Sequence, residues 1–228
     1  MNDNNALYRK LENCSASVVV LGMGYVGLPL AVVLAEAGYQ VTGVDLDQSK
    51  VDQLNRGVSY IEDVETSLVS KLVKAGSLRA TADFSAVKDA DAVSICVPTP
   101  LRKTRDPDLS FIVSVTESIA PFVHRGMVVI LESTTYPGTT RELVLPILLA
   151  DKDLIIGEDF YLAFSPERVD PGREDWTTKN TPKVVGGLTP SCTRMAARFY
   201  QSAMENVVEM LGDGSGALVL EGAKGMVS

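Results

Sequence analysis

The chain is poor in several residue types that mark common protein classes. Its 228 residues contain one histidine and three cysteines. Cys14, Cys96 and Cys192 are odd in number and widely spaced, so we expect neither a disulfide framework nor a cysteine metal site, but reduced thiols. The N-terminus lacks the basic start and long apolar core of a signal peptide, and no apolar run approaches the roughly 20 residues that span a membrane. These features predict a cytoplasmic protein.

Positive charge is also scarce. Lysine and arginine number 21 against 29 acidic residues, which gives a formal net charge of −8. An acidic surface repels phosphate backbones and anionic lipid heads, so neither nucleic acid nor a membrane is an expected partner. A small anionic ligand could still bind through backbone N–H groups and a few local cations.

What the chain does contain is an alternation of strand-length apolar runs and helical stretches. The runs are β-branched and nearly continuous, which is typical of strands covered on both faces. Strands are predicted at 17–22, 40–45, 91–97, 127–133, 159–167 and 182–187. Helices are predicted at 26–37, 47–56, 62–75, 109–123, 139–150 and 189–203. The pattern predicts an α/β fold with a doubly wound, Rossmann-like parallel sheet.

Three segments divide the chain. Residues 1–16 are interpreted as an N-terminal extension and 17–210 as the doubly wound domain. The tail at 211–228 contains five glycines in eighteen residues and no clean period of a helix or strand. Since glycine costs helix and strand stability, we expect the tail to pack poorly, like a frayed terminus.

A glycine-rich turn follows the first predicted strand. Gly22, Gly24 and Gly27 have the spacing GxGxxG and open a helix, and Asp45 ends the next strand. The first glycine permits a tight turn, the second lets the backbone approach a pyrophosphate, and the third lets helix and strand pack closely. Asp45 would accept hydrogen bonds from a ribose 2′-OH and repel a 2′-phosphate, which favours NAD over NADP. FAD-binding enzymes use the same turn, so the motif alone leaves the cofactor open.

Neighbouring residues complete this predicted cofactor site. Tyr25 and Val26 lie inside the turn and are included among the cofactor contacts. Lys50 follows one turn into the next helix, where it either reaches the adenosine side or is a solvated surface lysine.

Two later strands end in polar segments, "CVPTP" and "ESTTYPGTT". Ligands of open α/β sheets lie beyond the carboxyl ends of the strands, so Val97, Thr99, Ser133 and Thr134 are predicted on the nicotinamide and substrate side. The alternative is structural: the prolines stop a strand, and Ser133 and Thr134 cap a helix.

With these pieces in place, the chain resembles the nucleotide-sugar 6-dehydrogenases, the UDP-glucose dehydrogenase family. The motifs "GMGYVGLPLA", "CVPTP", "ESTTYPGTT", "SPERVDPG" and "PKVVGG" occur in the family's order. The resemblance runs from about residue 17 to 209, and its motif forms are most similar to the bacterial enzymes of UDP-N-acetylhexosamines, particularly UDP-N-acetylglucosamine. Other two-domain NAD dehydrogenases, of the hydroxyacyl or phosphogluconate type, share the turn but not these motifs.

The resemblance implies oxidation of a sugar C6 alcohol to a carboxylate with reduction of two NAD molecules. It assigns the three glycines and Asp45 to NAD, and Thr134 to the nicotinamide side and to positioning the catalytic water. Glu167 matches the carboxylate assigned to general acid/base work on that water. Prolines on both sides of Glu167 restrict the backbone and would keep the carboxylate aimed.

The resemblance also implies a nucleophilic cysteine in a C-terminal domain, within a motif that the printed sequence does not contain. We therefore expect an NAD-binding portion without the family's C-terminal domain, with an incomplete UDP-sugar pocket and little turnover alone. The alternative is a catalytically silent NAD-binding module that pairs with an intact homologous subunit or with itself.

Overall fold

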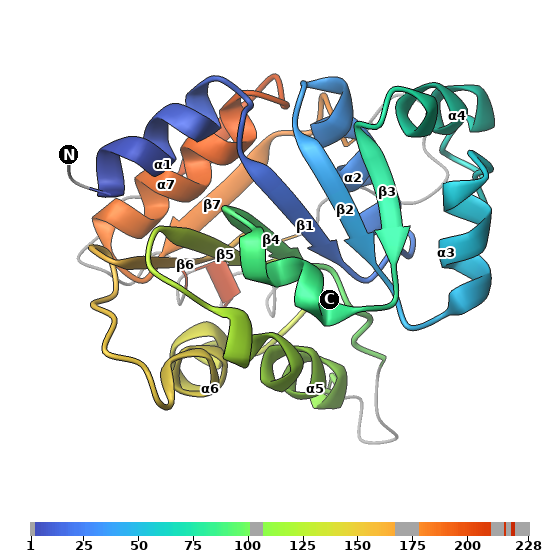
Figure 1. Cartoon of the computed structure of the whole chain (residues 1–228). Coiled ribbons are helices and arrows are strands. Elements are labelled where there is room, and N and C mark those ends of the chain that lie inside the picture. The colour runs from blue at the N-terminus through green and yellow to red at the C-terminus, as the bar shows by residue number, and fades with distance from the viewer. Residues whose placement is uncertain (1–2, 101–106, 167–177, 211–216, 218–219, 222–228) are drawn as a thin grey trace.

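The computed structural model describes residues 3–100, 107–166, 178–210, 217, 220 and 221. The strands are β1 (Ser17–Leu21), β2 (Gln40–Val44), β3 (Leu78–Thr81), β4 (Ala92–Ile95), β5 (Met127–Leu131), β6 (Phe160–Phe164), β7 (Lys183–Gly187) and β8 (Val207–Glu209). They form one eight-stranded sheet in the order β3-β2-β1-β4-β5-β6-β7-β8 (Figure 1). The order runs outward from β1 in both directions, which confirms the predicted doubly wound architecture.

Strand direction is parallel from β3 to β6 and changes once. β7 pairs antiparallel with β6, through Phe164 opposite Gly186, and β8 is again parallel to β7. The prediction of a parallel sheet is therefore confirmed for β3 to β6 and wrong for β7. As a consequence, β7 begins at the sheet edge where β1, β4, β5 and β6 end.

Helices cover both faces of the sheet. The helical elements are α1 (Asp3–Glu12), α2 (Gly27–Glu36), α3 (Gln48–Asn55), α4 (Thr66–Lys74), the 3₁₀ turn η1 (Phe84–Asp89), α5 (Ser110–Ile119), the 3₁₀ turn η2 (Ala120–Phe122), the π-helical turn η3 (Thr139–Val144), α6 (Leu145–Leu149) and α7 (Pro190–Gln201). Side chains of α1, α2, α3, α4 and α7 join one core cluster, whereas those of η1, α5 and α6 join the cluster on the opposite face. All five residues of β5 are buried, because this central strand is covered on both sides.

The predicted helices begin and end near their expected residues, with two differences. The helix expected from 62 begins only at Thr66. The helix expected at 139–150 opens as a π-helical turn and becomes α-helical at Leu145. Pro146 has no N–H to donate to the carbonyl four residues earlier, which accounts for the irregular bonding in front of it. Thr189 caps α7 as predicted, its hydroxyl accepting from Cys192 N at 3.2 Å, with Pro190 at the first position.

Four elements were not predicted: α1, β3, η1 and β8. α1 lies along α7 (Figure 1), with Leu7 and Leu11 buried against the core. The buried Tyr39 hydroxyl donates a hydrogen bond to Leu11 O at 2.8 Å, which holds the C-terminal end of α1 against the core. The extension predicted at 1–16 thus contains a packed helix, Asp3–Glu12. No helix among the described residues has both the length and the hydrophobicity to cross a membrane.

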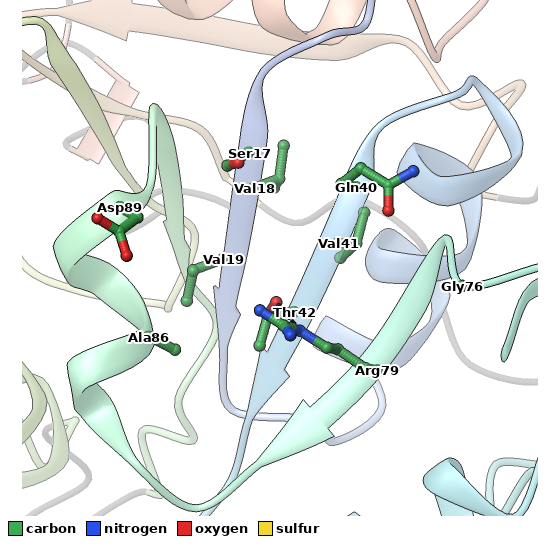
Figure 2. Close-up of a pocket in the computed structure, with 10 residues that line it drawn as sticks. All are labelled: Ser17, Val18, Val19, Gln40, Val41, Thr42, Gly76, Arg79, Ala86 and Asp89. Carbon is green, nitrogen blue, oxygen red and sulfur yellow. Dashed lines mark hydrogen bonds between the residues drawn. The ribbon is translucent and has the colours of Figure 1, made fainter.

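A polar hollow of about 290 Å³ lies over β1, β2 and β3 on the side of η1 (Figure 2). Ser17 and Gln40, the first residues of β1 and β2, line it together with Thr42, Arg79 and Asp89. Since it includes the amino ends of the strands, it is separate from the edge at which the glycine turn lies.

Candidate functional site

The glycine turn joins β1 to α2, and each of its three glycines meets a different constraint. Gly22 has a φ of +88°, and a Cβ there would lie 2.8 Å from Cys96 O, at the end of β4. A Cβ at Gly27 would overlap the carbonyl oxygen of Gly22. At Gly24 a Cβ would meet no atom within 4 Å. The fold itself therefore requires glycine at positions 22 and 27, whereas Gly24 faces open space.

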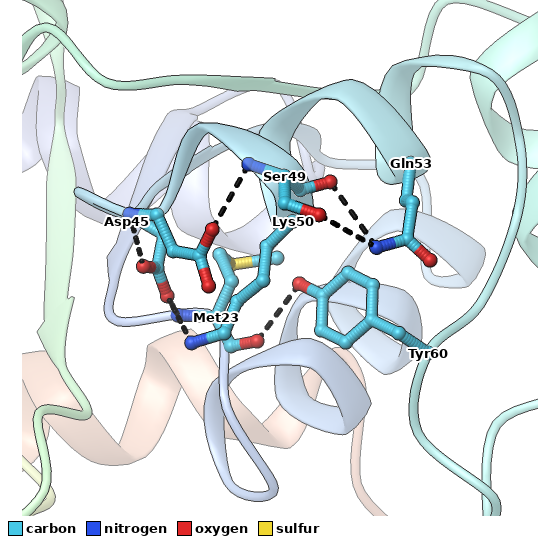
Figure 3. A network of polar contacts seen from close by, with 7 residues as sticks. Met23, Asp45, Ser49, Lys50, Gln53 and Tyr60 are labelled. Carbon is cyan, nitrogen blue, oxygen red and sulfur yellow. Dashed lines mark hydrogen bonds and ion pairs between the residues drawn. The ribbon is translucent and has the colours of Figure 1, made fainter.

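Asp45, at the carboxyl end of β2, braces this turn. Its carboxylate accepts hydrogen bonds from Met23 N at 2.9 Å and from Asp47 N at 2.9 Å (Figure 3). It also pairs with Lys50 Nζ at 3.1 Å. A carboxylate offers about four acceptor positions, so these three bonds leave room for one more donor. The structure thus joins three predicted site elements, the turn, Asp45 and Lys50, in one polar network.

Two features near Asp45 were not predicted. The ion pair of Lys50 with Asp45 is the first, and it contradicts the alternative of a simply solvated lysine. Tyr60, from the loop after α3, donates its hydroxyl to Met23 O at 2.8 Å (Figure 3). Burial, and then the nearby Asp45 carboxylate, raise the pKa of Tyr60, so it remains a donor. No spacing in the sequence signals this long-range contact.

Exposed apolar side chains flank the network. Tyr25 is 70% exposed on the glycine turn, and Leu46, directly after Asp45, is 75% exposed. Val26 is partly buried against the core below the turn. Leu46 was not among the predicted site residues, although its place directly after Asp45 indicates that it lies at this edge of the sheet.

The ends of β4 and β5 meet beside the turn. A Cβ at Gly22 would lie 3.2 Å from Val97 Cα. The segment that begins at Val97 and includes Thr99 therefore starts next to the glycine turn. Ser133 Oγ donates to Val97 O at 2.7 Å and is buried, while Thr134 is exposed. Ser133 therefore links the two strand ends, and the alternative that it caps a helix is wrong.

The remaining predicted catalytic residue cannot be placed in this geometry. Ser165, after β6, donates its hydroxyl to Val184 O at 2.9 Å and holds the start of "SPERVDPG" at the sheet. Glu167 lies outside the described residues, and its predicted role stays a prediction.

None of the three cysteines has the surroundings of an activated nucleophile. Cys96 and Cys192 are buried, and Cys14 is partly buried. Burial raises the pKa of the Cys192 thiol, which outweighs the hydrogen bond donated by the Thr189 hydroxyl. A buried thiol with a raised pKa is a poor nucleophile.

Three residues of the tail pack at the carboxyl edge of the sheet. This contradicts the frayed terminus that we expected at these positions. Ala217 and Leu220 join the core, and Glu221 is 1% exposed. The Glu221 carboxylate accepts from Gly138 N at 2.6 Å, from Thr140 N at 2.9 Å and from Thr140 Oγ1 at 2.5 Å. It thereby satisfies backbone N–H groups at the start of η3 from 81 residues away.

This carboxylate predicts a pH dependence of stability. Burial raises the pKa of Glu221 above its usual 4.5, and this outweighs the three hydrogen bonds that lower it. The folded state thus binds the proton more tightly, so the group's contribution is complete below pH 4.5 and is lost as the pH rises through the folded-state pKa.

Glu221→Gln removes the titration and one acceptor, at a cost of about 1–3 kcal/mol at acidic pH. We expect the difference between the two proteins in urea unfolding to shrink as the pH rises from 4.5 to 8. A constant difference between the two proteins over this pH range would contradict the prediction.

Residues 16–204 match the family described as the UDP-glucose/GDP-mannose dehydrogenase family, NAD binding domain. The chain belongs to this family. Its fold and its NAD cofactor are those of the family's NAD-binding domain, which confirms the predicted resemblance and cofactor.

Two relatives are named as dehydrogenases of UDP-sugars. The chain is 38% identical over 197 residues to the UDP-N-acetyl-D-mannosamine dehydrogenase of Escherichia coli K12, covering 83% of this chain and 46% of that protein. It is 34% identical over 184 residues to the UDP-N-acetyl-D-glucosamine 6-dehydrogenase of Salmonella typhi, covering 81% and 42%. The chain thus spans about half the length of these relatives.

Solved structures agree. The NDP-N-acetyl-D-galactosaminuronic acid dehydrogenase of Methanosarcina mazei Go1 superposes with a TM-score of 0.83 at 33% identity, covering 97% of this chain and 48% of that one. A 3-hydroxyisobutyrate dehydrogenase from Salmonella typhimurium, at a TM-score of 0.62 and 14% identity, shares the fold alone.

Proposed function

We propose that this chain supplies the NAD-binding part of a UDP-sugar 6-dehydrogenase. The substrate class is a UDP-N-acetylhexosamine, whose C6 alcohol is oxidised to the carboxylate. The observation that carries the proposal is the hydrogen bond that the Asp45 carboxylate accepts from Met23 N in the glycine turn, next to the ends of β4 and β5. The names of the relatives include both mannosamine and glucosamine sugars, and the proposal extends to either.

NAD fits the residues at this edge. The open space at Gly24 would admit the pyrophosphate close to the backbone, and the start of α2 would face its charge. The free acceptor position of Asp45 would take a ribose hydroxyl. Val97, Thr99, Ser133 and Thr134 would lie on the nicotinamide side, with Tyr25 and Leu46 against the rest of the cofactor.

The overall reaction would consume one alcohol, two NAD⁺ and one water, and yield one carboxylate, two NADH and three protons. When bound, NAD⁺ would supply the chemistry by accepting a hydride in each of the two oxidation steps. This chain's residues would bind and orient it, and Thr134 and Glu167 would position and deprotonate the water. The family's cysteine step would use a motif that the printed sequence does not contain.

Binding of NAD to the purified chain tests the proposal. At an NAD concentration about 100 times its Kd, the free energy of unfolding should rise by about 2.7 kcal/mol, seen as a higher melting temperature. NADP should bind at least about tenfold more weakly, because its 2′-phosphate would meet the Asp45 carboxylate. Absence of any shift at saturating NAD, or equal binding of NADP, would contradict the proposal.

A second candidate function is a silent NAD-binding module that pairs with a homologous subunit or with itself. The observation in its favour is the edge strand β8, where Val208 is 47% exposed. Light scattering of the chain, alone and mixed with a full-length homologue, distinguishes this candidate by the mass of the complex.

A further inference from the structure

A buried polar cluster lies at the carboxyl edge of the sheet and is not part of the network around Asp45. Glu132, the residue after β5, is 1% exposed. Its carboxylate accepts a hydrogen bond from the Tyr200 hydroxyl of α7 and forms an ion pair with Lys183 of β7. Lys183 is 6% exposed and Tyr200 is fully buried. The lysine Nζ also lies 5.3 Å from the centre of the Tyr200 ring.

The topology explains why these three elements meet. Because β7 runs antiparallel to β6, its first residue, Lys183, lies at the edge where β5 ends. Side chains at 128, 130 and 132 point to the face that α7 covers, since alternate residues of a strand share a face. Tyr200 reaches Glu132 from that helix.

Stability alone does not account for such a cluster. Burying an ion pair costs so much desolvation that apolar replacements are often neutral or stabilising. The cluster instead fixes the orientation of the Glu132 side chain, because its carboxylate forms two charge-assisted bonds. Glu132 N also donates to Ile95 O at 2.9 Å, so the residue is held on both its backbone and its side chain.

The fixed residue directly precedes the segment that the proposed function places at the nicotinamide. Ser133 Oγ bonds to Val97 O at 2.7 Å, and Thr134 is exposed at the edge. We propose that Glu132, Lys183 and Tyr200 are positioning residues that set the backbone of Ser133 and Thr134 for the nicotinamide half of NAD. This inference rests on the proposed function.

The test compares NAD with ADP-ribose. ADP-ribose lacks the nicotinamide ring but keeps both riboses, the pyrophosphate and the adenine. Tyr200→Phe removes only the hydroxyl that bonds to Glu132. We expect it to weaken NAD binding about threefold to tenfold, the effect of one lost buried hydrogen bond, and to leave ADP-ribose binding unchanged. Isothermal titration of the full chain measures both affinities.

Tyr39→Phe is the matched control. Tyr39 is also fully buried and also donates its hydroxyl, but to Leu11 O on the α1 side. This variant should leave the ratio of the two affinities as in the wild type. If Tyr200→Phe folds poorly, the double variant Glu132→Gln/Lys183→Met removes both charges together and should lower the same ratio.

The outcomes separate the inference from the function beneath it. Selective loss of NAD affinity in the Tyr200 and double variants supports the inference. Equal loss for both ligands, or no loss, overturns it while NAD binding by the wild type still supports the proposed function. A wild-type chain that binds neither ligand overturns both.

Discussion

Gly27→Ala is expected to destabilise the folded state strongly. The new Cβ would overlap the carbonyl oxygen of Gly22, an atom of the backbone that cannot rotate away, and would lie 3.3 Å from Val20 Cγ1. Overpacking against backbone should cost at least about 3 kcal/mol, a large part of the 5–15 kcal/mol that stabilises a typical domain. Urea unfolding followed by circular dichroism measures the loss.

Gly24→Ala is the control, because its Cβ would meet no atom within 4 Å. Its free energy of unfolding should change by less than about 0.5 kcal/mol. NAD affinity, in contrast, should fall at least about tenfold, since the methyl group would occupy the space proposed for the pyrophosphate. Native stability in Gly27→Ala would contradict the packing argument, and unchanged NAD affinity in Gly24→Ala would contradict the site.

Lys183→Met should cause the second large loss. The Glu132 carboxylate, 1% exposed, would lose its cationic partner inside the core. Removing one member of a buried ion pair typically costs about 3–5 kcal/mol.

The double variant Glu132→Gln/Lys183→Met separates the lost pair from the lost lysine. It removes both charges, so most of the stability should return relative to Lys183→Met alone. Chemical denaturation of the wild type and both variants at neutral pH gives the comparison. A double variant no more stable than Lys183→Met would show that lost packing of the lysine stem, and not the charge, sets the cost.

The sequence predicted the strands with long apolar runs and missed the short or polar elements. β3 and β8 have four and three residues, too few to show a period. α1 is mostly polar, and only the spacing of Leu7 and Leu11, four residues apart on one face, marked it as a packed helix. The tail was misjudged at Glu221 because its partners are 81 residues or more away.

The predicted site shows the same division. The GxGxxG spacing and the strand-end position of Asp45 were visible because they depend on local backbone geometry. The bonds of Asp45 with Met23 N and Lys50, and of Ser133 with Val97 O, were not visible, because they depend on where separate segments meet.

By itself, the sequence determined the doubly wound fold, the glycine turn and the family. Each follows from period, spacing or motif order, which are local properties of a chain. Only the tertiary structure decided the reversed direction of β7, and with it the meeting of Lys183, Glu132 and Tyr200. An apolar run in the sequence indicates that a strand is buried, but not in which direction the strand runs in the sheet. A buried charge is stabilised only by partners that folding brings next to it.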